Sequence, residues 1–332
     1  MPPIRTLTAL CLTAALAAPA ARADSPIPAP AASAPAELAG VPFGTMDFDW
    51  RDESRSRSVP VRLYLPDAAA AGKPVPLVVF SHGIGGSRMG YSYLGRYWAS
   101  QGYASLHLQH VGSDRNLWAG NPFGLVGRLR DAAQDKEAIA RVLDLHFALD
   151  QLLAGPLASR IDADRIVAAG HSYGANTTLL AAGAQVERAG QKLDFRDARI
   201  KAAIILSAPP FYGETDPAKV LAGITVPTLH VTATEDIIRI PGYYSGATDR
   251  VAVFDATGSA RKALAVFAGG SHSMFTDRSG TGGMALNPKV KDATRALSLA
   301  FLKDVFDGED AALRQWPAQF AGIVARYTRL GL

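Results

Sequence analysis

The sequence contains one cysteine, Cys11, among 332 residues. A lone cysteine forms neither an intramolecular disulfide nor a cysteine-based zinc site, so the chain must fold around an apolar core alone. The net charge is also small, because 34 Lys and Arg and 30 Asp and Glu leave a surplus of only +4. A surplus this small, spread along the chain, predicts no nucleic-acid partner. Hydrophobic residues make up 48% of the chain and charged residues 19%, which excludes a disordered polymer and a multispan membrane protein.

The N-terminal segment is typical of a secretory signal peptide. Arg5 gives a short positive start, residues 7–18 form an apolar run, and Ala21-Arg22-Ala23 offers small residues where signal peptidase requires them. The run is shorter than the ~20 apolar residues that span a membrane. We therefore predict a cleaved signal peptide over residues 1–23, no stable membrane insertion, and a periplasmic or secreted protein. Residues 24–43, rich in proline and alanine and nearly free of charge, predict an extended tether.

Residues 44–332 show short β-type runs alternating with helical patterns, which predicts one α/β domain. The later runs are almost continuously apolar, as expected for a mostly parallel sheet with helices on both faces. The eight predicted strands cover residues 45–50, 59–65, 77–81, 104–109, 165–169, 202–207, 228–234 and 263–268. The predicted helices cover 91–100, 135–153, 172–182 and 289–305, and Trp316 and Phe320 predict a further helix after residue 307.

The clearest chemical signal is Gly170-His171-Ser172-Tyr173-Gly174, which matches G-x-S-x-G between a predicted strand and a predicted helix. A sharp strand-to-helix turn lifts a serine hydroxyl clear of the sheet, and glycines are needed where the backbone is crowded. The start of the helix adds partial positive charge near a developing oxyanion. We predict that Ser172 is a nucleophile.

A second glycine-rich motif, His82-Gly83-Ile84-Gly85-Gly86, follows the predicted strand 77–81. Glycines there allow backbone N–H groups to point into a site, where they stabilise charge that appears in the transition state. We predict that the N–H groups of Ile84 and Tyr173 form an oxyanion hole. His82 is interpreted as a brace for this loop and not as a titrating group.

The general base should follow the nucleophile in the chain, because this architecture orders its triad serine, acid, histidine. His272 lies just after the last predicted strand and meets this requirement. His110 also ends a strand, but it precedes Ser172 and is interpreted as a pocket residue. The other histidines lie within strands, within a helix or beside the motif residues: His82, His107, His146, His171 and His230.

The acid that orients the histidine should lie between Ser172 and His272, at the end of a strand. Asp236 follows the predicted strand 228–234 and is the favoured candidate. Glu235 is the near alternative, and Asp216 and Asp255 are distant ones.

Three long connections follow predicted strands, at residues 112–134, 211–226 and 241–257. Ligands of open α/β sheets bind outside the carboxyl ends of the strands, so these connections are expected to border the site. Three side chains near them are candidates for substrate binding: His110, Trp118 and Tyr212.

These motifs make the sequence similar to the α/β-hydrolase superfamily, and more narrowly to bacterial proteins related to platelet-activating-factor acetylhydrolase and dienelactone hydrolase. The resemblance covers most of residues 58–275. It rests on the turn of the G-x-S-x-G motif, residues 170–174, which we call the elbow, and on Phe80-Ser-His-Gly-Ile-Gly-Gly-Ser-Arg88, Ala99-Ser-Gln-Gly-Tyr103 and His110-Val-Gly-Ser-Asp114. Dienelactone hydrolase proper uses a cysteine where this chain has Ser172. Polyester hydrolases related to cutinase are similar in layout, but they usually carry Trp-Ser-Met where this chain has His171-Ser172-Tyr173.

The resemblance implies an α/β-hydrolase fold and a catalytic triad of Ser172, Asp236 and His272. We predict a secreted or periplasmic serine esterase that forms an acyl-enzyme and needs no metal or organic cofactor. Its substrate would be a small-molecule or polymeric carboxylic ester. The alternatives are a cutinase-like polyester hydrolase, an amidase or peptidase with the same triad, and a non-catalytic binding protein on a hydrolase scaffold.

Overall fold

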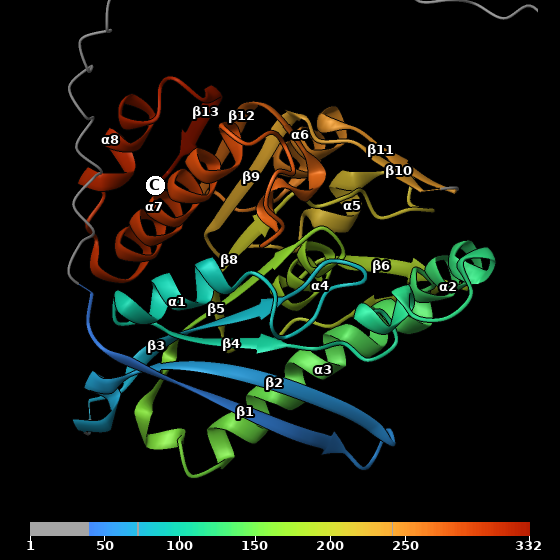
Figure 1. Ribbon diagram of the computed structural model, residues 1–332, viewed down its shortest axis with the longest axis horizontal. Helices are drawn as coiled ribbons and strands as arrows, with labels where there is room; N and C mark the ends of the chain where they lie inside the picture. The colour runs from blue at the N-terminus through green and yellow to red at the C-terminus, as the bar shows by residue number, and fades with distance from the viewer. Residues whose placement is uncertain (1–39, 72, 241) are drawn as a thin grey trace, which may run out of the picture. The chain divides into compact units, whose positions relative to one another are not determined.

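The computed structural model describes residues 40–71, 73–240 and 242–332. The predicted signal peptide and residues 24–39 of the predicted tether lie outside them. A nine-stranded sheet runs in the order β1-β2-β4-β3-β5-β8-β9-β12-β13 (Figure 1). The stretch from β4 to β12 is parallel, and β1, β2 and β13 are antiparallel strands at the two edges. The strands are β1 (Phe43–Asp52), β2 (Arg57–Pro66), β3 (Val75–Ser81), β4 (Ala104–Leu108), β5 (Ile161–His171), β8 (Ile200–Leu206), β9 (Thr228–Glu235), β12 (Lys262–Ser271) and β13 (Val324–Leu330).

Helices cover both faces of this sheet (Figure 1). Successive strand residues point to opposite faces, so Val79 joins one apolar cluster while Val78 and Phe80 join the other. The first cluster includes side chains of α3 (Asp135–Ala154), α4 (Tyr173–Ala182) and α5 (Pro217–Leu221). The second includes α1 (Ser92–Ser100), α7 (Leu286–Asp307) and α8 (Ala311–Gln319). The remaining helices are α2 (Leu125–Ala132), α6 (Ala247–Ala256), η1 (Asp67–Ala71), η2 (Arg115–Trp118), η3 (Pro122–Gly124), η4 (Ala158–Arg160) and η5 (His272–Phe275).

Two short hairpins form two-stranded sheets of their own, separate from the nine-stranded sheet. They are β6 (Gln185–Arg188) with β7 (Gln191–Asp194), and β10 (Ile238–Ile240) with β11 (Tyr243–Ser245). Neither hairpin was predicted, because strands of three or four residues are too short for a clear alternation of polar and apolar residues. No helix of the described residues has both the length and the apolarity that crossing a bilayer requires.

The sheet has nine strands and not the eight that were predicted. All eight predicted strands overlap observed ones, and the missed strand is β13. It carries charged and half-exposed residues, including Arg326 and Arg329, because it lies at an edge and pairs only with β12. An edge strand needs no continuous apolar run, which is the signal that revealed the central strands. The helix predicted after residue 307 is present as α8.

The predicted boundary between tether and domain is slightly late. β1 begins at Phe43, so the last residue of the predicted tether belongs to the sheet. The two residues before it are also bonded to the domain: Val41 N donates to Ser100 O at 2.7 Å, and Pro42 O accepts from Asp67 N at 2.8 Å.

The parallel strands all point the same way, so their carboxyl ends lie side by side along one end of the sheet. β5 ends at His171, β9 at Glu235 and β12 at Ser271. The next residue in each case is a predicted triad member, so the parallel arrangement brings together residues up to 100 positions apart.

Candidate active site

Ser172 occupies a strained turn between β5 and α4. Its φ of 55° and ψ of −121° lie outside the regions that non-glycine residues favour. The turn is tightly packed, because a Cβ atom added at Gly170 would lie 2.2 Å from Gly174 O. A Cβ atom added at Gly174 would lie 1.9 Å from Ser81 O on β3. Both glycines of the G-x-S-x-G motif are therefore required for the backbone approach that presents the Ser172 side chain.

The three predicted triad residues form one hydrogen-bonded series. His272 Nε2 lies 2.7 Å from Ser172 Oγ, and His272 Nδ1 lies 2.6 Å from Asp236 Oδ1. A carboxylate only accepts hydrogen bonds, so Nδ1 carries the proton and Nε2 is free to accept from the serine hydroxyl. This tautomer is the one in which an imidazole can take a proton from Ser172.

Asp236 is fully buried and remains acidic. Burial alone would raise its pKa, but the hydrogen bond from His272 and the charges of His272 and Arg250 outweigh burial and lower the pKa. Ser207 Oγ and Thr232 Oγ1 donate to Oδ2 at 2.5 and 2.7 Å. Arg250 Nη2 lies 3.6 Å from Oδ1. The carboxylate therefore stays ionised and fixed in orientation beside the imidazole.

The alternative acids do not contact His272. Glu235 and Asp255 are exposed, and Asp216 accepts hydrogen bonds from the backbone N–H groups of Ala218 and Lys219 at the start of α5. Among the described residues, Asp236 is the carboxylate hydrogen-bonded to the histidine.

The glycine-rich loop after β3 lies beside the nucleophile. Ile84 and Tyr173, the two predicted oxyanion residues, line the same cavity as Ser172. Tyr173 begins α4, where N–H groups have no intrahelical acceptor. The loop is held by hydrogen bonds from Gly85 N to Ser113 O and from Gly86 N to Gly83 O, at 2.8 and 3.0 Å. These bonds leave the N–H of Ile84 between two anchored glycines.

His171 links this loop to the loop that carries His272. Its Nε2 lies 3.0 Å from the carbonyl oxygen of His272, so Nε2 is the donor. Its Nδ1 must then accept from the Tyr91 hydroxyl at 2.8 Å, and Tyr91 Oη in turn accepts from Gly83 N at 3.2 Å. Burial lowers the pKa of His171 to about 3, so the residue stays neutral and keeps this pattern of donors.

Three buried charged residues and the half-buried Arg57 lie next to the glycine-rich loop; we call Arg57, Glu137, Arg141 and Asp144 the buried ion cluster. Arg141 is fully buried and donates to His82 O in the loop and, at 2.7 Å, to Ser113 Oγ. Its guanidinium also lies 4.5 Å from the centre of the Tyr173 ring. The cluster therefore contacts both segments that carry the predicted oxyanion donors.

His110 was predicted to be a pocket residue, and the structure contradicts this. Its side chain is fully buried, with Nδ1 3.0 Å from Asp144 Oδ2 and Nε2 3.1 Å from Ser81 Oγ. Its backbone N donates to Nε2 of His82, which is itself buried in the loop. Position at a strand end was the signal for His110, but that signal does not show whether a side chain points outward or down into the fold.

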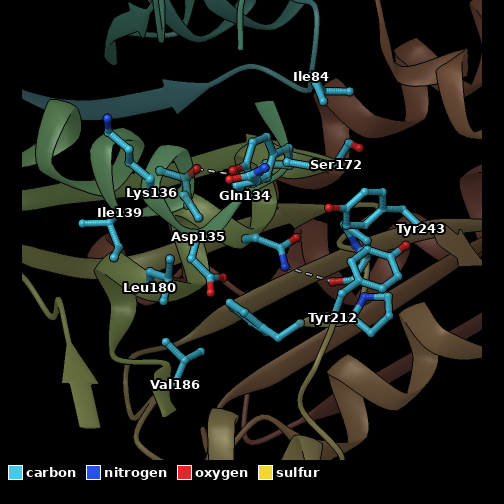
Figure 2. A pocket seen from close by; sticks show the side chains of 18 of the residues that line it. Ile84, Gln134, Asp135, Lys136, Ile139, Ser172, Leu180, Val186, Tyr212 and Tyr243 are labelled. Carbon is cyan, nitrogen blue, oxygen red and sulfur yellow. Dashed lines mark hydrogen bonds between the residues drawn. The ribbon is translucent and has the colours of Figure 1, made fainter. Parts of the chain in front are cut away.

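A cavity of about 460 Å³ opens beside Ser172 (Figure 2). Tyr212, a predicted substrate residue, lines it, and its ring packs edge-on against Tyr243 with centres 5.1 Å apart. Trp118 is not among the residues that line it; its Nε1 donates to Gly85 O at 2.8 Å and its ring lies against Gly85. All three long connections contribute to the wall, through Leu129, Phe211 and Tyr243 among others. The two hairpins that were not predicted also contribute: Val186, Arg188 and Leu193 from one, Ile238, Ile240 and Tyr243 from the other.

No group of three or more His, Cys, Asp and Glu side chains within the described ranges is arranged to hold a metal ion. The ionisable groups nearest Ser172 are His272 and Asp236, and they are hydrogen-bonded to each other. The chemistry that this arrangement supports is proton transfer between Ser172 and His272.

Comparisons with known proteins agree with this architecture. The profile of the family described as "Platelet-activating factor acetylhydrolase, isoform II" matches residues 54–116, which include the glycine-rich loop. A search of curated sequences finds no match. Among solved structures, the ferulic acid esterase from Streptomyces cinnamoneus is similar with a TM-score of 0.63 and 23% identity, over 90% of this chain and 98% of that chain. The predicted resemblance and the α/β-hydrolase fold are thereby confirmed.

Proposed function

We propose that this chain is a serine hydrolase that cleaves carboxylic esters through an acyl-enzyme. The observation that carries the proposal is the hydrogen-bonded series from Asp236 through His272 to Ser172, with the serine on a strained elbow. A strained φ of 55° at a buried-strand terminus costs free energy, and such strain clusters at functional sites. The resemblance to two kinds of esterase supports the same reaction class.

In the proposed reaction, Ser172 Oγ attacks the acyl carbon while His272 Nε2 accepts the hydroxyl proton. Asp236 stabilises the imidazolium that forms, because its low pKa keeps it ionised next to Nδ1. The oxyanion accepts hydrogen bonds from Ile84 N and Tyr173 N. His272 then delivers the proton to the leaving alcohol, and water clears the acyl-enzyme by the same steps.

A periplasmic or extracellular location is also part of the proposal. It rests on the predicted signal peptide, residues 1–23. Fractionation of cells that express the full chain, with N-terminal sequencing of the exported product, tests it. A product that still begins at Met1 and stays in the cytoplasm would contradict this location.

Hydrolysis of p-nitrophenyl esters by the wild type and by Ser172→Ala tests the proposed reaction. Removing the nucleophile of a working triad should lower kcat on the order of a million-fold. Ser159→Ala is the matched control, because Ser159 is exposed in η4, before the start of β5 and away from Ser172, and it should keep wild-type activity. If Ser172→Ala keeps its activity, the proposed nucleophile is wrong. If the wild type cleaves amides but no ester, the chain is an amidase with the same triad.

A further inference from the structure

The geometry of ester cleavage assigns a direction to each part of the substrate. The tetrahedral acyl carbon carries Ser172 Oγ, the oxyanion, the leaving oxygen and the acyl chain. The leaving oxygen must lie near His272 Nε2, which protonates it, and the oxyanion must face Ile84 and Tyr173. The acyl chain takes the remaining direction, away from His272.

The cavity extends in that remaining direction. Ile84, Ser172 and Tyr173 line it, whereas His272 is not among the described residues in its wall. It follows one face of α4, since Tyr173, Thr177 and Leu180 recur at the helical spacing of three or four residues. Figure 2 shows Ile84 and Ser172 at one end of the group of lining side chains and Val186 at the other.

The far wall of the cavity carries the apolar side chains of Val186 and Leu193 beside the ion pair of Arg188 with Asp135, and it is firmly held. Val186 and Leu193 come from the β6–β7 hairpin, and Leu193 packs against the first apolar cluster, the one that contains side chains of α3, α4 and α5. Arg188 ties the hairpin to its neighbours, because its Nε donates to Asp135 Oδ2 at 2.7 Å and its Nη1 pairs with Glu214. The depth of the cavity is therefore set by an anchored wall.

The leaving-group side is open by comparison. Residues 277–280, shortly after His272, are exposed, and Arg278 lies 6.0 Å from the centre of the Trp118 ring. The side chain of His272 is itself 16% exposed. A leaving alcohol near its Nε2 would thus lie close to solvent and not in an enclosed apolar space.

We propose that the cavity is the acyl-binding site and that the substrates are esters of a long or bulky apolar acyl group with a small alcohol. This inference rests on the proposed ester hydrolysis. A volume of about 460 Å³ lies within the range of small-molecule sites. Burying one methylene group should raise kcat/KM about four-fold until the cavity is full.

Two isomeric esters test the assignment with the full chain. Ethyl hexanoate and hexyl acetate have the same atoms, but they place the longer chain on opposite sides of the ester bond. The hexanoyl group has four more methylenes than the acetyl group, so we expect kcat/KM, measured by acid release, to favour ethyl hexanoate by about 250-fold. Equal rates, or a preference for hexyl acetate, would overturn the inference.

Variants of the far wall give a second test. Leu193→Trp and Val186→Phe shorten the cavity, so the best substrate in a series from ethyl butanoate to ethyl decanoate should move to a shorter acyl chain. Leu330→Trp on β13 is the matched control, because Leu330 is exposed at the opposite edge of the sheet, and its chain-length profile should match the wild type. An unchanged profile in both wall variants would place the acyl group elsewhere.

Failure of this inference and failure of the proposed reaction are distinguishable. If Ser172→Ala abolishes cleavage but hexyl acetate is preferred, the esterase proposal stands and the cavity assignment falls. If neither isomer is cleaved in a Ser172-dependent way, the proposed reaction itself is wrong.

Discussion

Two groups of buried charges lie close to Ser172, and they differ in what they contact. Asp236 is hydrogen-bonded to His272, which in turn contacts the nucleophile. Asp144, in the buried ion cluster, accepts hydrogen bonds from Arg57 and from His110, and neither of these contacts Ser172. One group of charges reaches the reacting atoms, and the other supports the loop beside them.

The pKa directions of the two carboxyls reflect this difference. Burial raises the pKa of Asp144 and exceeds the opposing contributions of Arg57 and Arg55. Burial also acts on Asp236, but its contacts with His272, Arg250 and Ser207 prevail and lower its pKa. Both carboxyls are fully shielded from solvent, so burial alone does not identify a catalytic acid. A direct contact with the base does.

Among variants of these two groups of buried charges, the largest effect should come from Asp236→Asn. Loss of the carboxylate removes the group that holds the His272 tautomer, and we expect kcat to fall about 10⁴-fold. The matched variant Asp144→Asn removes the other buried carboxylate and should lower stability far more than turnover. Steady-state kinetics and urea unfolding of both variants decide the comparison. If Asp144→Asn loses as much turnover as Asp236→Asn, the two groups do not have separate roles.

Arg141→Met should affect the loop that carries the predicted oxyanion donors. It leaves the carbonyl of His82 and the Ser113 hydroxyl without their buried donor, so the free energy of unfolding should fall by about 1–3 kcal/mol. We also expect kcat to fall 10- to 100-fold, because Arg141 contacts both the loop and the Tyr173 ring.

The control for this variant is Arg165→Met, which removes a partly exposed ion pair with Asp307 and should cost under about 1 kcal/mol. A variant at Arg141 that is destabilised yet keeps full kcat at low temperature would limit the cluster to a folding role.

The smallest effect should be a displaced pH profile in Arg250→Met. The Arg250 cation helps to lower the pKa of Asp236. Without that cation the pKa of Asp236 rises, so the carboxyl becomes protonated, and its support of His272 is lost, at a higher pH than in the wild type. The loss of kcat/KM on the acid side should therefore begin at a higher pH.

Arg250→Lys restores the charge and should return the acid side of the profile toward its wild-type position. A profile that moves equally in both variants would attribute the effect to packing and not to charge.

Local sequence patterns predicted much of this molecule because the chemistry depends on short segments. The G-x-S-x-G elbow needs its glycines because the adjoining strand and turn leave no room for a side chain. The five-residue motif was therefore enough to predict that Ser172 is the nucleophile. Asp236 and His272 were predicted because each directly follows a strand, and the carboxyl ends of parallel strands lie side by side. The same signal failed for His110, whose side chain points into the buried ion cluster.

What lay beyond the sequence depends on contacts between distant segments. β13 pairs with the otherwise free edge of β12, and the β6–β7 hairpin that lines the cavity is bonded to α3 through Arg188. The sequence by itself determined the alternating α/β pattern, the elbow and the order of the three triad candidates, since these follow from local backbone geometry and periodicity. Only the tertiary structure decided the hydrogen-bonded series, the pKa of Asp236 and the position of the cavity, because convergence and burial arise when remote residues pack together.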